Sequence, residues 1–236
     1  MTQLQQQAAQ LFDIALTDAQ AAQFEQYAQE LSAWNSHTNL TAISDPEGIR
    51  VRHFLDSLSV VQAIPLQPGL FAIDIGTGAG FPGLPLAIAF PEIKVTLLDS
   101  TGKKVKFLDH VVATLGLSNV RTVHARAEEA GHISHHRAHY GLVLARAVAR
   151  LPGLVEYMLP LAKVGGYCVA MKGETAQTEA DDSKHALSVL GGRLNQVQAV
   201  TLPEVEQTHY LITIEKTAPT PKGYPRKPGI PTRQPL

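Results

Sequence analysis

The sequence has few cysteines and no long apolar run, and each shortage excludes a class of protein. Among its 236 residues only Cys168 is a cysteine, so no disulfide forms within the chain and a disulfide-stapled secreted fold is excluded. No apolar stretch approaches the roughly 20 residues that a membrane-spanning helix needs. The start, Met-Thr-Gln-Leu-Gln-Gln-Gln, has no basic segment of the kind that opens a secretory signal. We therefore expect a cytoplasmic protein with no membrane partner.

Basic residues are absent from one end of the chain and concentrated at the other. The net charge is −1, yet residues 1–49 contain no Lys or Arg, whereas residues 216–236 contain five basic residues and no acid. A basic end on a near-neutral protein indicates a local contact with phosphates, although a merely solvated tail also fits.

Six prolines in residues 217–236 exclude, by the same kind of reasoning, a helix or a central strand there. Tyr224 stands close to Arg226 and Lys227, an arrangement suited to single-stranded RNA through stacking and charge. An extended linker is the alternative reading of this tail.

Residues 70–85 contain the most informative pattern in the chain. An apolar run ends at Ile75 and is followed by glycines at 76, 78, 80 and 83, and then by a second apolar run. This order predicts a strand, a tight turn and a helix, the place where an α/β sheet receives a nucleotide-like ligand. The spacing of Gly78 and Gly83 keeps a nicotinamide-dependent oxidoreductase open as an alternative, but the strand then ends too early.

Two acidic residues favour S-adenosylmethionine over a nicotinamide cofactor as the ligand. Asp74 before the glycines looks like the S-adenosylmethionine turn of class I methyltransferases. Asp99 ends the next apolar run, where a carboxylate accepts hydrogen bonds from both ribose hydroxyls.

The alternation of apolar runs predicts an α/β fold with a seven-stranded, mainly parallel sheet of Rossmann-like type. Two helices are expected within residues 2–35 and a third over 45–64. We expect strands near 70–75, 94–98, 120–124, 140–145, 166–171, 194–200 and 209–215, and helices near 83–90, 102–115, 151–162 and 177–190. The last two strands, joined by a short polar link, are expected to form an antiparallel hairpin. These elements divide the chain into a helical extension (1–66), a catalytic domain (67–216) and the basic tail (217–236).

Several polar side chains are candidates for ligand or RNA contacts. Arg146 follows the fourth strand, where ligand contact and a structural ion pair are both open. Arg52 and His53 lie on the third predicted helix, where an Arg52–Asp56 pair and a surface histidine are the alternative. Lys103 and Lys104 begin the helix after Asp99, and Lys172 follows the fifth strand.

Cys168 falls inside a strand and is expected in the core. The histidines between 132 and 139 lack ligands at metal-binding spacing, so no metal is expected.

In their order along the chain, these motifs resemble the RsmG (GidB) family of bacterial 16S ribosomal RNA guanine-N7 methyltransferases. The resemblance covers nearly the whole chain, through Trp34-Asn35, Asn39-Leu40-Thr41, Arg52-His53, Asp56-Ser57, Asp74–Pro85, Leu97–Ser100, Lys103-Lys104, Arg126-Ala127-Glu128, Arg146-Ala147, Lys172-Gly173 and Tyr224–Gly229.

The resemblance implies a class I methyltransferase with S-adenosyl-L-methionine as cofactor and a guanine in the decoding-region loop of 16S rRNA as substrate, free or within the 30S subunit or an assembly intermediate. We expect the protein to act as a monomer. The implied cofactor contacts are Gly76, Gly78 and Phe81 near the methionine part, Asp99, Ser100 and Thr101 near the ribose, Ala127 and Glu128 near adenine, and Arg146 at the crevice. The expected RNA contacts are Arg52, His53, Lys103, Lys104, Lys172, Tyr224, Arg226 and Lys227.

The chemistry of this reaction explains why no catalytic base stands out. Guanine N7 has a free lone pair and no proton to remove, so alignment of the reactants supplies most of the catalysis. No residue is assigned as catalytic, and Arg146 is the best candidate. A non-catalytic RNA-binding module with this fold remains a further alternative.

Overall fold

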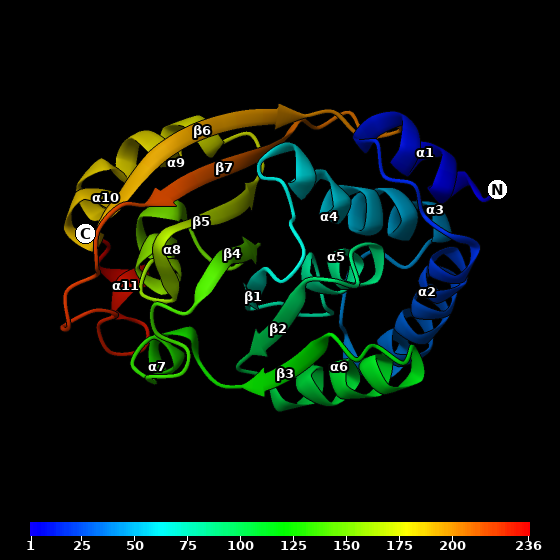
Figure 1. Ribbon diagram of the computed structural model, residues 1–236, viewed down its shortest axis with the longest axis horizontal. Helices are drawn as coiled ribbons and strands as arrows, with labels where there is room; N and C mark the ends of the chain where they lie inside the picture. Colours follow the sequence, from blue (N-terminus) through cyan, green and yellow to red (C-terminus); the bar gives the residue numbers. More distant parts are fainter.

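The computed structural model describes residues 1–236 and contains one seven-stranded sheet with helices on both faces (Figure 1). The strand order is β3-β2-β1-β4-β5-β7-β6. The first five strands along this order are parallel, and β7 pairs antiparallel with both β5 and β6. The predicted sheet and its terminal hairpin are therefore confirmed.

The strands lie close to their predicted positions. They are β1 (Phe71–Ile75), β2 (Lys94–Asp99), β3 (Val120–His124), β4 (Tyr140–Arg146), β5 (Ala162–Lys172), β6 (Gly192–Val200) and β7 (His209–Lys216). The helices that follow the glycine turn and Asp99 are α5 (Gly83–Ala89) and α6 (Gly102–Thr114).

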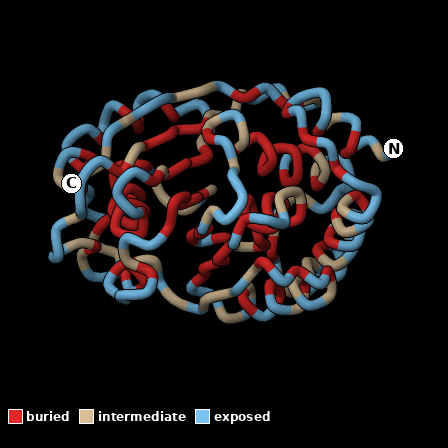
Figure 2. Tube along the Cα trace, viewed as in Figure 1, coloured by how far each residue is buried: buried red, intermediate tan, exposed pale blue.

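The side chains of the central strands point alternately into two separate hydrophobic cores. In β4, Leu142 and Leu144 belong to a cluster of 38 buried residues, whereas Val143 and Ala145 belong to one of 24. This alternation follows from the two-residue period of a strand. The larger core lies under α5, α6 and the amino-terminal helices, and the smaller under α8–α10, so the buried segments run through the middle of the molecule (Figure 2).

Two helices form in the first 38 residues, as predicted. In α1 (Gln3–Phe12) and α2 (Asp18–Thr38), a threonine before the helix and a glutamine three residues later satisfy each other's backbone groups. The buried face of α2, which includes Phe24, Tyr27 and Leu31, packs into the larger core. No helix of the structure combines the length and apolarity that crossing a membrane requires.

The third predicted helix is composite rather than continuous. Asp45 caps α3 (Pro46–Gly48), and the chain continues through the π-helix η1 (Ile49–Leu55), α4 (Asp56–Leu58) and the 3₁₀-helix η2 (Ser59–Gln62). π-helical turns are frequent at functional sites. This one carries Arg52 and His53, and Asp56 follows it directly.

Other boundaries differ for local reasons. The helix predicted over 151–162 ends earlier, as α8 (Leu151–Met158), because Pro160 disfavours helix before it. The helix predicted over 177–190 is split into α9 (Ala176–Asp182) and α10 (Lys184–Leu190) at Ser183, whose hydroxyl donates to the carbonyl of Glu179 at 2.7 Å. A short helix, α7 (Ala127–Ala130), follows β3.

The expectation that the proline-rich tail contains no helix is wrong. Residues Ile230–Arg233 form the short helix α11, with Pro231 in its first turn, where a missing N–H costs nothing. The helix packs against α8 (Figure 1).

Candidate active site

The turn after β1 brings bare backbone to the carboxyl edge of the sheet. Gly78 has a φ of +64°, and a Cβ there would meet no atom closer than 4.0 Å, so this part of the turn is open to a ligand. Gly80 differs, because a Cβ at its φ of +105° would lie 2.4 Å from Leu84 and 2.8 Å from the Tyr27 hydroxyl. Gly80 therefore serves the packing of the turn, and Gly78 serves its accessibility.

Two buried carboxylates hold this turn. Asp99 at the end of β2 accepts hydrogen bonds from the backbone N–H groups of Gly78, at 2.9 Å, and Thr101, at 2.8 Å. Asp74 in β1 accepts from the Thr77 hydroxyl at 2.5 Å and from the Gly83 N–H at 2.9 Å through one oxygen. Burial raises the pKa of Asp74 to about 7, against the opposing effect of these two bonds.

A hollow of about 180 Å³ lies beside the turn, at the carboxyl ends of the strands. Four of the predicted cofactor contacts line it: Gly76, Ser100, Ala127 and Glu128. Its wall also includes Leu98, Ala125, Arg126, Val148, Tyr157 and Thr232, none of which was predicted as a cofactor contact. Tyr157 and Thr232 come from α8 and α11, whose approach to this edge has no local sequence signal.

The donor and acceptor set of this edge fits S-adenosylmethionine. The open backbone at Gly78 admits close approach, and each Asp99 oxygen accepts only one backbone bond, which leaves capacity for ribose hydroxyls. The second oxygen of Asp74, Oδ1, is buried without a hydrogen-bond partner. Asp99 thus retains acceptor capacity for a ligand that carries hydroxyl donors.

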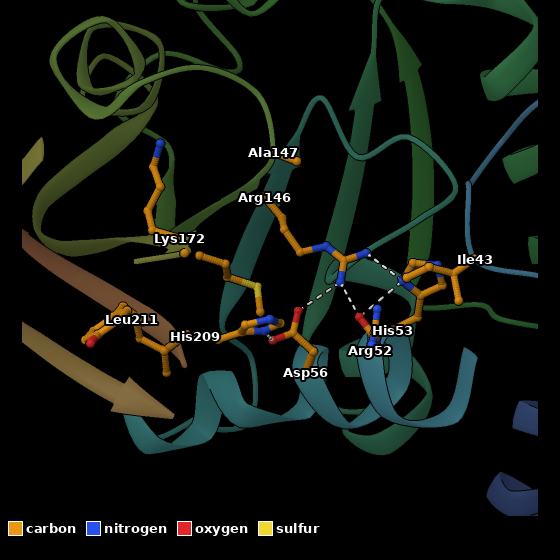
Figure 3. Close-up of a pocket in the computed structure, with 12 residues that line it drawn as sticks. Ile43, Arg52, His53, Asp56, Arg146, Ala147, Lys172, His209 and Leu211 are labelled. Carbon is orange, nitrogen blue, oxygen red and sulfur yellow. Dashed lines mark hydrogen bonds and ion pairs between the residues drawn. The ribbon is translucent and has the colours of Figure 1, made fainter. Parts of the chain in front are cut away.

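A second hollow, of about 450 Å³, is lined in part by Arg146 and Ala147 at the end of β4 (Figure 3). Predicted RNA contacts Arg52, His53 and Lys172 line it together with Arg146. Its wall also includes His209, at the start of β7, which was not predicted. The antiparallel insertion of β7 beside β5 brings this histidine to the site.

Arg146 is the centre of a polar network in this hollow. Its Nη1 donates to Asp56 Oδ2 and to the carbonyl of Arg52, both at 2.9 Å, and its guanidinium lies 5.0 Å from the centre of the Phe81 ring. The Nδ1 of His209 lies 2.8 Å from the other Asp56 oxygen, and this bond raises the pKa of His209. Asp56 therefore pairs with Arg146 rather than with Arg52, contrary to the intrahelical alternative.

His53 joins the same network through both ring nitrogens. Its Nδ1 lies 3.1 Å from Arg146 Nη2, which can only donate, and 3.2 Å from the carbonyl oxygen of Arg52, which can only accept. Its Nε2 lies 2.8 Å from the Thr41 hydroxyl. Burial, followed by the charge of Arg146, lowers the pKa of His53 to about 4, so this ring is neutral at physiological pH. Phe81 stacks on it at a centroid distance of 4.3 Å.

Some predicted residues have partners within the protein. Lys172 Nζ lies 2.8 Å from Glu179 Oε2, and Arg226 Nη2 lies 2.7 Å from Glu156 Oε2. Phe81 is buried beneath Arg146 and His53, outside the smaller hollow. Lys103 is exposed and Lys104 half-exposed at the start of α6, close to the glycine turn. Cys168 is buried in β5, as predicted.

Together, the sheet order, the glycine turn after β1 and the acid that ends β2 define a class I S-adenosylmethionine-dependent methyltransferase. Solved structures agree on the fold. A SAM-dependent methyltransferase from Aquifex aeolicus has a TM-score of 0.56 at 18% identity, covering 75% of this chain and 97% of that one. A precorrin-6y C5,15-methyltransferase from Geobacter metallireducens has a TM-score of 0.53 at 17% identity, covering 68% of this chain and 87% of that one.

Sequence comparison identifies the family. The model of the GidB family, described as rRNA small subunit methyltransferase G, matches residues 20–209. The chain is 48% identical to ribosomal RNA small subunit methyltransferase G of Alkaliphilus metalliredigens, over 94% of this chain and 92% of the relative. It is 49% identical to the protein of that name from Halalkalibacterium halodurans, over 94% and 93%.

The chain belongs to the rRNA small subunit methyltransferase G family. The predicted family, the methyltransferase activity and S-adenosylmethionine as cofactor are confirmed, and the oxidoreductase and non-catalytic alternatives are set aside.

Proposed function

We propose that this protein transfers the methyl group of S-adenosylmethionine to N7 of a guanine in the decoding-region loop of 16S rRNA. The observation that carries the proposal is the arrangement of the two hollows around one short segment. Arg146 and Ala147 line the larger hollow, and the next residue, Val148, lines the smaller. A cofactor in the smaller hollow and an unstacked base in the larger would therefore lie on the two sides of residues 146–148.

The smaller hollow would hold the cofactor through backbone and carboxylate groups. Asp99 would accept from the ribose hydroxyls, with Ser100 and Thr101 beside it. Ala127 and Glu128 would border the adenine, and the backbone of the turn at Gly76 and Gly78 the methionine part. When bound, S-adenosylmethionine supplies an electrophilic methyl group on its sulfonium. The chain's own task is to hold that group in line with the acceptor.

The larger hollow would orient the guanine. A guanidinium has five donors, and Arg146 uses three of its hydrogen bonds on Asp56, Arg52 and His53. Donors therefore remain for guanine O6, while N7 stays free to accept the methyl group. No base is needed, because N7 has no proton to lose, and orientation alone can account for roughly 7–11 kcal/mol in favourable cases.

The basic and aromatic groups around the hollows would contact the rest of the RNA. Arg52, Lys103, Lys104 and Lys227 are candidates for phosphate contacts, and Tyr224 for a stacked base. We propose further that the enzyme acts as a cytoplasmic monomer on 16S rRNA within the 30S subunit or an assembly intermediate. His53, Lys172 and Arg226 would act indirectly, because their side chains already bind other parts of the protein.

The test uses 16S rRNA and 30S particles from cells that lack this protein. Incubation with the enzyme and methyl-labelled S-adenosylmethionine should place one label on a decoding-region guanine. Borohydride and aniline treatment, which cleaves RNA at N7-methylguanine, should then break the chain at that base. Label on another atom, or no label on either substrate, would contradict the proposal. Comparison of the two substrates identifies the one that the enzyme uses.

A further inference from the structure

The carboxy-terminal tail lies outside the residues that the family model matches, yet it is folded against the catalytic domain. The match ends at residue 209, whereas residues 217–236 follow β7 and pass beside α7 and α8 (Figure 1). This placement was not predicted: the expectation was an RNA contact or an extended linker.

One buried ion pair anchors the tail. Glu156 in α8 has no exposed surface and accepts from Arg226 Nε at 3.0 and 3.1 Å and from Nη2 at 2.7 Å. The backbone N–H of Arg226 donates to the same carboxylate at 2.6 Å. A buried carboxylate with this many donors holds the chain firmly, because loss of the partner would leave an unpaired buried charge.

Arg137 and His132 anchor the tail from the other side. The Arg137 guanidinium donates to the carbonyls of Tyr224, Thr220 and Pro221 at 2.8, 2.9 and 3.1 Å, in addition to the carbonyl of Gly131. His132 Nε2 lies 2.7 Å from the carbonyl of Pro225. Two basic side chains of one loop thus bind backbone carbonyls of the tail.

Beyond these anchors, α11 approaches α8 at a point that only glycine permits. A Cβ on Gly153 would lie 2.6 Å from the Pro231 carbonyl oxygen and 3.1 Å from its carbon. Both are backbone atoms, so a methyl group at this position must displace α11. On the same side, the Gly229 N–H donates to Glu128 Oε1 at 3.0 Å. The Glu128 carboxylate therefore binds the tail.

The result is that Thr232 of α11 lines the smaller hollow together with Gly76, Ser100 and Ala127. We infer that the tail, through Thr232, forms one wall of the cofactor pocket and determines its affinity for S-adenosylmethionine. The inference rests on the proposed placement of the cofactor in this hollow. It assigns Gly153 and Arg226 as positioning residues that act through the tail, and Thr232 as the tail residue at the pocket surface, while Glu128 both lines the pocket and binds the tail.

Calorimetric titration of the full-length protein with S-adenosylmethionine tests this inference. Gly153→Ala, which displaces α11, should raise the Kd at least tenfold, and Thr232→Trp, which fills the hollow, should do the same. Gly223→Ala is the matched control for the first change, because a Cβ there meets no atom within 4 Å and this residue lies outside the hollow. Gln234→Trp is the control for the second, since Gln234 is exposed and does not line the hollow. Both controls should keep the Kd within twofold of the original.

The affinity of each variant for a 16S rRNA fragment, measured by filter binding, should stay within twofold of the original protein. Folded variants with an unchanged cofactor Kd would overturn the inference while leaving the proposed function intact, and a parallel loss of RNA affinity would overturn it as well. If Gly153→Ala does not fold, the Thr232→Trp variant decides the question, because Thr232 is exposed and its replacement should not prevent folding. Failure of the original protein to bind S-adenosylmethionine would instead overturn both the proposed function and the inference that the tail forms a wall of the cofactor pocket.

Discussion

At the scale of single residues, Arg146 holds together the polar network of the larger hollow. Its guanidinium joins β4 to the η1–α4 segment through Asp56, the Arg52 carbonyl and His53. The side chain was expected either to contact ligand or to form an ion pair. The structure shows the ion pair, at a place where the same group faces the larger hollow.

Replacement of Arg146 by Ala should therefore lower kcat/KM for 16S rRNA by roughly 10²–10³-fold, the usual cost of one oriented donor. Arg146→Lys is the matched control: it keeps the charge but cannot hold Asp56, the Arg52 carbonyl and His53 together, so we expect it to recover only a small part of the loss. Single-turnover methyl transfer is the measurement. Full activity of the lysine variant would show that charge, and not the planar fork, is what the site needs.

His53 predicts a pH dependence of stability. Its folded-state pKa of about 4 lies below the unfolded value of 6.5, so the unfolded chain binds more protons between these pH values. The stability associated with the neutral ring is complete above pH 6.5 and is lost as the pH falls toward 4, by up to about 3 kcal/mol. Urea unfolding of His53→Gln should show a shallower loss over this range than the original protein. Equal slopes would mean that the ring is protonated in the folded state.

Asp74 acts in the opposite direction, which is why the comparison with the unsubstituted protein is essential. Its folded-state pKa of about 7 lies above the unfolded value of 3.8, so its contribution to stability falls as pH rises between these values. This term is present in both proteins and cancels in their difference.

At the scale of elements, two glycines of the turn after β1 have different roles: Gly78 is expected to serve ligand binding and Gly80 the stability of the fold. Gly78→Ala adds a methyl group in open space at a φ of +64°, with an expected cost of about 1–2 kcal/mol of folding free energy. The same methyl group would lie between the backbone and the cofactor, so the S-adenosylmethionine Kd should rise at least tenfold.

Gly80→Ala is the matched comparison within the same turn. It should cost about 2–5 kcal/mol, from a φ of +105° and the collision with Leu84 and the Tyr27 hydroxyl. Thermal unfolding gives the stabilities and calorimetry the Kd values. A Gly78→Ala variant that binds the cofactor normally would remove this backbone from the site.

The elements also show which parts of the site local sequence can reveal. The turn and Asp99 were predicted because a strand, its following glycines and the next strand's terminal acid are close in sequence and obey fixed periods. His209 meets Asp56 across 153 positions of sequence, and Gly229 meets Glu128 across 101. Such contacts depend on the insertion of β7 beside β5 and on the path of the tail. No local period encodes either one.

The prediction that the proline-rich tail contains no helix was wrong for a related reason. Proline excludes the interior of a helix but not its first turn, and the four-residue helix α11 is little more than that turn. The basic composition suggested exposure, whereas the carboxylate that binds Arg226 is buried in α8, far away in sequence.

At the scale of the whole molecule, the amino-terminal helices and the sheet share one core. The larger cluster includes Phe24 of α2, Leu55 of η1 and Leu97 of β2, and Trp34 packs against Phe107 of α6 at a ring distance of 5.6 Å. The division at residue 66 therefore separates segments of sequence that are joined by continuous apolar packing.

This packing predicts that residues 1–66 do not unfold independently. Trp34 is the only tryptophan, so its fluorescence follows α2, while bound S-adenosylmethionine measured by equilibrium dialysis follows the edge of the sheet. In urea, fluorescence and far-ultraviolet circular dichroism should give one coincident transition without ligand, and binding competence should be lost at that same midpoint when the ligand is subsaturating. Phe24→Ala, which opens the shared core, should lower the midpoint by both probes together, at a cost of about 3–5 kcal/mol. Ser32→Ala on the exposed side of α2 is the control and should shift neither probe appreciably. A fluorescence transition that precedes the loss of cofactor binding would instead establish the helical extension as a separate folding unit.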